Sequence, residues 1–85
     1  MITSKITLMD PMGLHARIAT KIVQCAQNFT CEITLFFNGQ RSEAKDILGL
    51  MALDIREGET LEIDFNGSDE TKAQAAMLNV LKEYQ

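Results

Sequence analysis

Apolar and polar residues alternate with two different periods along this 85-residue chain. In three segments the apolar residues recur at alternate positions, which predicts strands with one buried face over residues 2–8, 32–37 and 61–66. The "NG" dipeptide at residues 38–39 is a strong hairpin signal, and it predicts a turn into a short polar strand over residues 40–43. Four strands are therefore expected.

Helices are predicted where apolar residues recur at intervals of three and four. This spacing runs over residues 15–29 and predicts a helix that begins near His15 and extends to Phe29. Asp46 is a suitable N-cap for a short second helix, and a third helix follows "NGSDE" at residues 66–70. The third helix is expected to bury Ala73, Ala76, Met77, Val80, Leu81 and Tyr84. The predicted order of elements is β-α-β-β-α-β-α.

Elements that are apolar on one face only favour an α+β fold of two layers, in which three helices cover one face of a four-stranded antiparallel sheet. The other sheet face is expected to meet water through Thr7, Thr34, Phe36 and Glu62, although Phe36 is an apolar residue at a polar position. A chain of this length is expected to form a single domain over residues 1–85.

Composition excludes several classes of protein. The net charge of -4 argues against a nucleic-acid surface, which needs a concentrated basic patch. No stretch approaches the roughly 20 apolar residues that cross a bilayer, and residues 1–10 lack the features of a secretory signal, so a soluble cytoplasmic protein without membrane insertion is expected. Cys25 and Cys31 belong to no CxxC or Cys/His cluster, so no metal site is predicted and both are interpreted as half-buried thiols in a reducing compartment.

The only histidine, His15, lies at the predicted start of the first helix, within "MGLHARIATKI" at residues 12–22. The unpaired N–H groups of a helix's first turn favour an anion, and imidazole is a competent nucleophile at neutral pH. These N–H groups and Arg17 could therefore bind a phosphoryl group carried on the ring, while Gly13 lets the backbone approach closely. Alternatively, His15 is an exposed loop residue and Arg17 a solvated charge. No second base, paired carboxylates or nucleotide-binding loop is present, so a complete phosphotransferase is not expected.

A second informative stretch is "DILGLMALDI" at residues 46–55. Its apolar residues spread around the short predicted helix, so some of them are expected to face solvent and to form a surface for a partner. The alternative is that all of them are core residues and that the helix covers the core as a lid. The residues concerned are Ile47, Leu48, Leu50, Met51 and Leu53.

Two motifs together resemble a known family. With "GLHAR" at 13–17, "AKDILGLMAL" at 44–53, the element order and the length, the chain resembles HPr, the histidine-containing phosphocarrier of the bacterial sugar phosphotransferase system, over essentially its whole length. The resemblance implies an open-faced β-sandwich. It also implies that His15 accepts a phosphoryl group on Nδ1 from phosphorylated Enzyme I, which draws it from phosphoenolpyruvate, and donates it to IIA domains of sugar permeases. Such a protein is a monomeric carrier with a phosphohistidine intermediate and no cofactor, rather than a stand-alone enzyme.

The resemblance also assigns site residues. Arg17 would hold the phosphate together with backbone groups around the start of the first helix, at Gly13, Ala16, Arg17 and Ile18. The positions that the family uses for docking to both partners are Thr20, Lys21, Gln24, Ile47, Leu48 and Met51.

Two residues depart from the family pattern. Ile18 replaces a proline that usually follows "GLHAR", which restores an N–H group at the anion site and loosens the backbone, so a working carrier with altered rates is expected. Asp46 replaces a serine that an ATP-dependent kinase phosphorylates in many relatives. Asp46 is interpreted as either a helix N-cap or a fixed charge that resembles the phosphorylated serine; in both cases control by that kinase is expected to be absent.

Related roles remain open. Crh, a paralogue, keeps the serine and lacks the histidine, which is the opposite of this chain. Nitrogen-type HPr proteins and the HPr-like domain of dihydroxyacetone kinase systems pass phosphate to other acceptors, and the sugar type is preferred because "AKDILGLMAL" is closer to its second motif. A transfer-impaired module that only binds partners through Ile47, Leu48 and Met51 is a further alternative.

Overall fold

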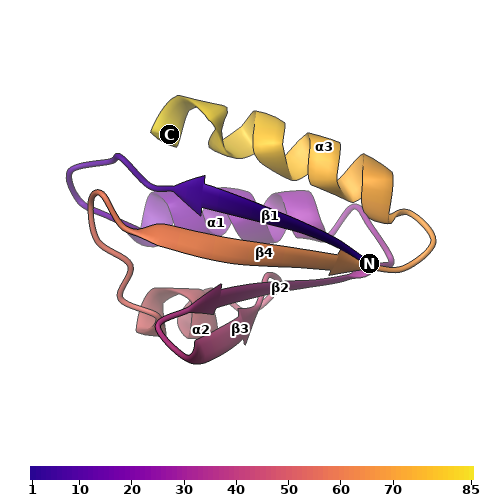
Figure 1. Ribbon diagram of the computed structural model, residues 1–85, viewed down its shortest axis with the longest axis horizontal. Helices are drawn as coiled ribbons and strands as arrows, with labels where there is room; N and C mark the ends of the chain where they lie inside the picture. The colour runs from indigo at the N-terminus through magenta and orange to yellow at the C-terminus, as the bar shows by residue number, and fades with distance from the viewer.

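A four-stranded antiparallel sheet forms one layer of the computed structural model, which describes residues 1–85. The strands pair in the order β1-β4-β2-β3, so β4, the last strand in sequence, lies between β1 and β2 (Figure 1). Their bounds are Ile2–Thr7 for β1, Glu32–Phe37 for β2, Gln40–Glu43 for β3 and Thr60–Asn66 for β4. In this register Ile6 faces Leu61 and Leu35 faces Ile63, which aligns the apolar residues on one face.

The helices form the second layer and lie on one side of the sheet (Figure 1). Helix α1 spans Ala16–Ala26, α2 spans Ile47–Ala52 and α3 spans Glu70–Leu81, followed by a 3-10 turn, η1, over Lys82–Tyr84. The predicted α+β fold, its two layers and the order β-α-β-β-α-β-α are confirmed. None of the helices combines the length and the apolar character that crossing a membrane requires.

A single cluster of 22 buried apolar residues fills the space between the layers. Burying each large side chain stabilises the fold by about 1.5–3 kcal/mol relative to leaving it in water. The largest side chains that are wholly buried are Phe65, Ile6, Leu8, Ile18, Ile22, Leu35, Leu50, Ile63, Met77 and Leu81. Ile18 is thus a core residue, and its side chain anchors the first turn of α1.

The predicted end of the first helix is wrong. Helix α1 ends at Ala26, and the N–H groups of Asn28 and Phe29 donate to the carbonyls three residues earlier, which tightens the chain into a 3-10-like turn. Phe29 still packs against the core, but it does so from the connection to β2. On α3 and η1 the predicted apolar face is correct, with Ala76 and Val80 only partly buried.

Both cysteines are more deeply buried than expected. Cys25 is 7 % exposed and Cys31 is 4 % exposed, and both are free thiols. Burial raises the pKa of Cys25, and burial together with the neighbouring Asp69 raises the pKa of Cys31 to about 11. The two thiols therefore behave as small core residues.

Candidate functional site

His15 is the N-cap of helix α1, as the sequence predicts. Its backbone is extended, its carbonyl accepts the N–H of Ala19 at 3.0 Å, and its Nδ1 nitrogen accepts the N–H of Arg17 at 3.3 Å. A ring nitrogen that accepts a hydrogen bond holds a lone pair, so the hydrogen bond assigns the proton of the neutral ring to Nε2. The nucleophilic lone pair of Nδ1 consequently points at the first turn of the helix.

The tight turn before His15 depends on glycine. Gly13 has a φ angle of +66°, and a Cβ atom there would lie 2.3 Å from the carbonyl oxygen of Ile55. The same oxygen accepts the N–H of Leu14 at 2.8 Å, which ties this loop to the segment before β4. Only glycine permits this close approach, and the approach determines the position of His15 at the start of α1.

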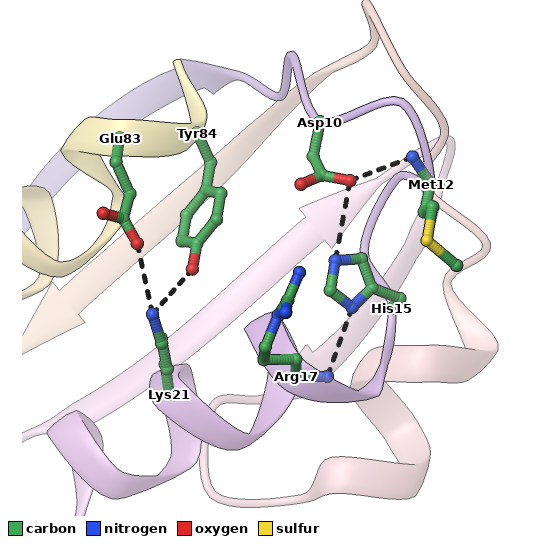
Figure 2. Close-up of polar contacts among 7 residues, drawn as sticks. All are labelled: Asp10, Met12, His15, Arg17, Lys21, Glu83 and Tyr84. Carbon is green, nitrogen blue, oxygen red and sulfur yellow. Dashed lines mark hydrogen bonds and ion pairs between the residues drawn. The ribbon is translucent and has the colours of Figure 1, made fainter.

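An acidic side chain faces the other edge of the ring. The Nε2 nitrogen of His15 lies 3.5 Å from the Oδ1 oxygen of Asp10, and each side chain is only 16 % exposed (Figure 2). The sequence analysis does not single out Asp10, because Asp-Pro is a common turn sequence and no motif marks it as a site residue. The signal that could have found it is the preference of aspartate for accepting the N–H two residues later, here Met12 at 2.9 Å, which turns its side chain back toward the loop.

Arg17 is exposed and takes part in none of the four ion pairs of the structure. Figure 2 shows its side chain beside the ring of His15. The N–H groups of Ala16 and Ile18 find no backbone acceptor, as is usual in a first helical turn. Gly13, Ala16, Arg17 and Ile18 are therefore brought around His15, where a guanidinium and unpaired N–H groups can bind an anion.

The expected docking residues lie on two neighbouring helices, α1 and α2. On α2, Ile47, Leu48 and Met51 are exposed, by 36 %, 76 % and 42 % respectively, whereas Leu50 and the C-cap residue Leu53 are buried. The alternative that the whole helix is core is therefore wrong. On α1, Thr20 and Gln24 are exposed. Three further exposed apolar side chains, which the sequence analysis does not include, are Met1, Met9 and Met12.

Lys21 is held by the C-terminal turn. Its ammonium group donates to the Tyr84 hydroxyl at 2.7 Å and to a Glu83 carboxylate oxygen at 3.1 Å (Figure 2). These two hydrogen bonds raise the pKa of Lys21, and the hydrogen bonds to Tyr84 and Lys21 lower the pKa of Glu83. A partner that uses Lys21 must therefore compete with η1 for its ammonium group.

Asp46 is the N-cap of α2. Its carboxylate accepts the N–H of Gly49 at 3.1 Å, so the interpretation as an N-cap is confirmed. A Cβ atom on Gly49 would lie 2.7 Å from the other carboxylate oxygen of Asp46. The side chain is folded back on its own helix, where it caps the first turn.

An imidazole beside an arginine at the start of a helix, on a two-layer βαββαβα fold, fits the class of small phosphocarriers, and comparison with known proteins leads to the same class. A family model described as "PTS HPr component phosphorylation site", where PTS is the phosphotransferase system, matches residues 2–83. The chain is 33 % identical to the phosphocarrier protein HPr of Neisseria meningitidis over 84 residues, which are 99 % of this chain and 94 % of the relative. It is 36 % identical to the HPr of Cupriavidus necator over 75 residues, covering 88 % and 84 % of the two chains.

Solved structures agree. The fold matches HPr-C-His from Thermoanaerobacter tengcongensis with a TM-score of 0.92 and 30 % identity, over 99 % of this chain and 94 % of the other. It matches HPr from Bacillus anthracis with a TM-score of 0.84 and 32 % identity, over 93 % and 94 %. The chain belongs to the HPr family, the phosphocarrier proteins of the phosphotransferase system. Another structural relative is described as an HPr dimer from Thermoanaerobacter tengcongensis, so a monomeric state remains a prediction for this chain.

Proposed function

We propose that His15 accepts a phosphoryl group on Nδ1 from phosphorylated Enzyme I and donates it to IIA domains of sugar permeases. The observation that carries this proposal is the hydrogen bond from the N–H of Arg17 to Nδ1, which places the lone pair of the neutral ring on Nδ1 and aims it at the first turn of α1. At 3.3 Å the bond is long, so an incoming phosphoryl group can displace it at small cost.

The surroundings of Nδ1 fit the product of this reaction. After Nδ1 bonds to phosphorus, the N–H of Arg17 is free to donate to a phosphoryl oxygen, and the N–H groups of Ala16 and Ile18 lie on the same turn. Ile18 is compatible with this role, because its side chain is wholly buried while its N–H, which a proline would lack, remains available. The guanidinium of Arg17 supplies a positive charge that no ion pair neutralises.

Docking is proposed to use the exposed apolar side chains beside the site. Ile47, Leu48 and Met51 of α2 lie next to α1, which carries Thr20, Lys21 and Gln24. Flexible or branched apolar side chains of this kind adapt to more than one partner, which suits a carrier that must bind a donor and an acceptor in turn. The proposed place of action is the cytoplasm, and two free cysteines agree with a reducing compartment.

The test is to incubate the purified protein with Enzyme I and labelled phosphoenolpyruvate. The proposal expects one acid-labile, base-stable phosphoryl group per chain, and none in His15→Ala. The labelled protein is then mixed with sugar-type IIA domains and with the acceptor of a nitrogen-type system. Loss of label only to the nitrogen-type acceptor would contradict the sugar-type role, and a parent protein that takes no label would favour a module that only binds partners.

A further inference from the structure

A carboxylate faces the proton-bearing edge of His15. The Nε2 nitrogen is buried, makes no hydrogen bond, and lies 3.5 Å from the Oδ1 oxygen of Asp10. Leaving a buried N–H without an acceptor is costly, and the Asp10 carboxylate is the acceptor that a movement of about 0.5 Å would supply. Hydrogen bonds of this kind are often long in a free protein and shorten in the reacting complex.

We propose that Asp10 is a positioning residue for phosphoryl transfer, an inference that rests on the proposed function of His15. The carboxylate holds the Nε2–H edge of the ring, so that Nδ1 keeps its orientation toward the first turn of α1. It also stabilises the positive charge that the ring gains when Nδ1 is phosphorylated.

Asp10 is itself held in place. Its Oδ1 oxygen accepts the N–H of Met12 at 2.9 Å, and its carbonyl accepts the N–H of Gly13 at 2.9 Å, which closes a turn over residues 10–13. Pro11 fixes the φ angle of the second position in this turn. The carboxylate is therefore placed before any partner binds, and at 16 % exposure its charge is only partly screened by water.

The role of Asp10 follows from where the electron pairs and the ring proton go during phosphoryl transfer. The Nδ1 lone pair forms the new bond to phosphorus while the bond between phosphorus and the donor atom breaks and leaves its electron pair with the donor. The proton stays on Nε2, so the phosphorylated ring carries a positive charge. In onward transfer the Nδ1–phosphorus bond breaks and its electron pair returns to Nδ1. A retained Nε2–H makes the ring the better leaving group, and a carboxylate on that edge favours its retention.

The two charges near the ring act on opposite edges. Arg17 lies beside the ring and its N–H group meets Nδ1, whereas Asp10 meets Nε2. The carboxylate is thus separated from the phosphoryl group by the ring, and its attraction for the Nε2–H, at shorter range, outweighs its repulsion of the phosphoryl oxygens. The negative charge of Asp10 can therefore support both the attachment and the release of the negatively charged phosphoryl group.

Asp10→Asn tests the proposal, with Asp64→Asn as the matched control. Asparagine keeps an oxygen for the N–H of Met12 and removes the charge. Asp64 lies near the other end of the sheet, where it pairs with Thr3 of β1 and accepts the Thr3 hydroxyl at 2.9 Å, so its replacement removes the same charge without touching the ring.

Two measurements are made on the full chain. In the unphosphorylated protein labelled with ¹⁵N-histidine, the Nε2–H proton is expected downfield and in slow exchange in the parent and in Asp64→Asn, and upfield and in faster exchange in Asp10→Asn. For transfer to a IIA domain, the rate constant at saturating acceptor is expected to fall about tenfold in Asp10→Asn, with an unchanged KM. About tenfold is the smallest effect expected from removing an opposite charge at this distance. An Nε2–H signal that does not move, or transfer equal to that of Asp64→Asn, overturns the proposal. A parent protein that takes no label refutes the proposed function instead, and the signal of the unphosphorylated ring still decides whether Asp10 holds Nε2.

Discussion

Gly13→Ala is expected to destabilise the protein far more than an alanine at another glycine with positive φ. At Gly13, alanine must adopt a φ near +66°, which costs about 1 kcal/mol for a residue with a side chain. Its Cβ atom would also lie 2.3 Å from the carbonyl oxygen of Ile55. Relieving that clash means moving an oxygen that accepts the N–H of Leu14, so strain and a weakened hydrogen bond add about 2 kcal/mol.

Gly58→Ala supplies the comparison. Gly58 has a φ of +85°, but nothing lies within 4 Å of a Cβ atom built there, so only the conformational cost of about 1 kcal/mol is expected. Both variants lose the same backbone freedom in the unfolded state, so that term cancels between them. The predicted difference in the free energy of unfolding is about 2 kcal/mol.

The assay is urea denaturation followed by far-UV circular dichroism, with the slopes of the transitions compared to verify two-state behaviour. Equal destabilisation of Gly13→Ala and Gly58→Ala, within about 0.5 kcal/mol, would refute the reasoning that the loop before His15 is fixed by its close approach to Ile55.

Three further predictions follow from individual side chains. Incubation with HPr kinase and labelled ATP should leave residues 40–50 unlabelled because Asp46 has no hydroxyl group, and label on a serine there would contradict this. Leu48→Ser should raise the KM for transfer while changing the free energy of unfolding by less than about 0.5 kcal/mol, because Leu48 is 76 % exposed; an unchanged KM would remove it from the docking surface. The folded-state pKa of Cys31 is raised to about 11, so its contribution to stability is present below the unfolded-state pKa of about 8.5 and is lost as pH rises from about 9 to 11. The urea concentration at the midpoint of denaturation should fall over that pH window more in the parent than in Cys31→Ala. Midpoints that change with pH in parallel in the two proteins would refute the raised pKa of Cys31.

The sequence predicts most of the fold because burial on one face leaves a regular pattern. Period-two alternation located the sheet, and the spacing on residues 73–84 located the last helix. The pattern predicts an end of α1 that is too late. Phe29 falls at helical spacing and packs against the core, but the helical backbone ends at Ala26. Apolar spacing records which side chains are buried, and it does not record which hydrogen bonds the backbone makes.

The candidate site was predictable only in part. Gly13, His15 and Arg17 lie within five consecutive residues, so local helix chemistry sufficed to bring them together. Asp10 reaches the ring because a turn folds back, and Lys21 is held by Glu83, 62 residues away in sequence. Contacts of this kind depend on the geometry of a closed turn or on tertiary packing, and no local spacing encodes them.

The most direct test of the proposed mechanism is to determine which ring nitrogen of His15 carries the phosphoryl group. The protein, labelled with ¹⁵N-histidine, is phosphorylated with Enzyme I and phosphoenolpyruvate, and the coupling between phosphorus and ring nitrogen is measured by NMR. Because Nδ1 accepts the Arg17 N–H and Asp10 faces Nε2, the coupling is expected to Nδ1. Coupling to Nε2, or a protein that acquires no phosphorus on His15, would contradict the mechanism.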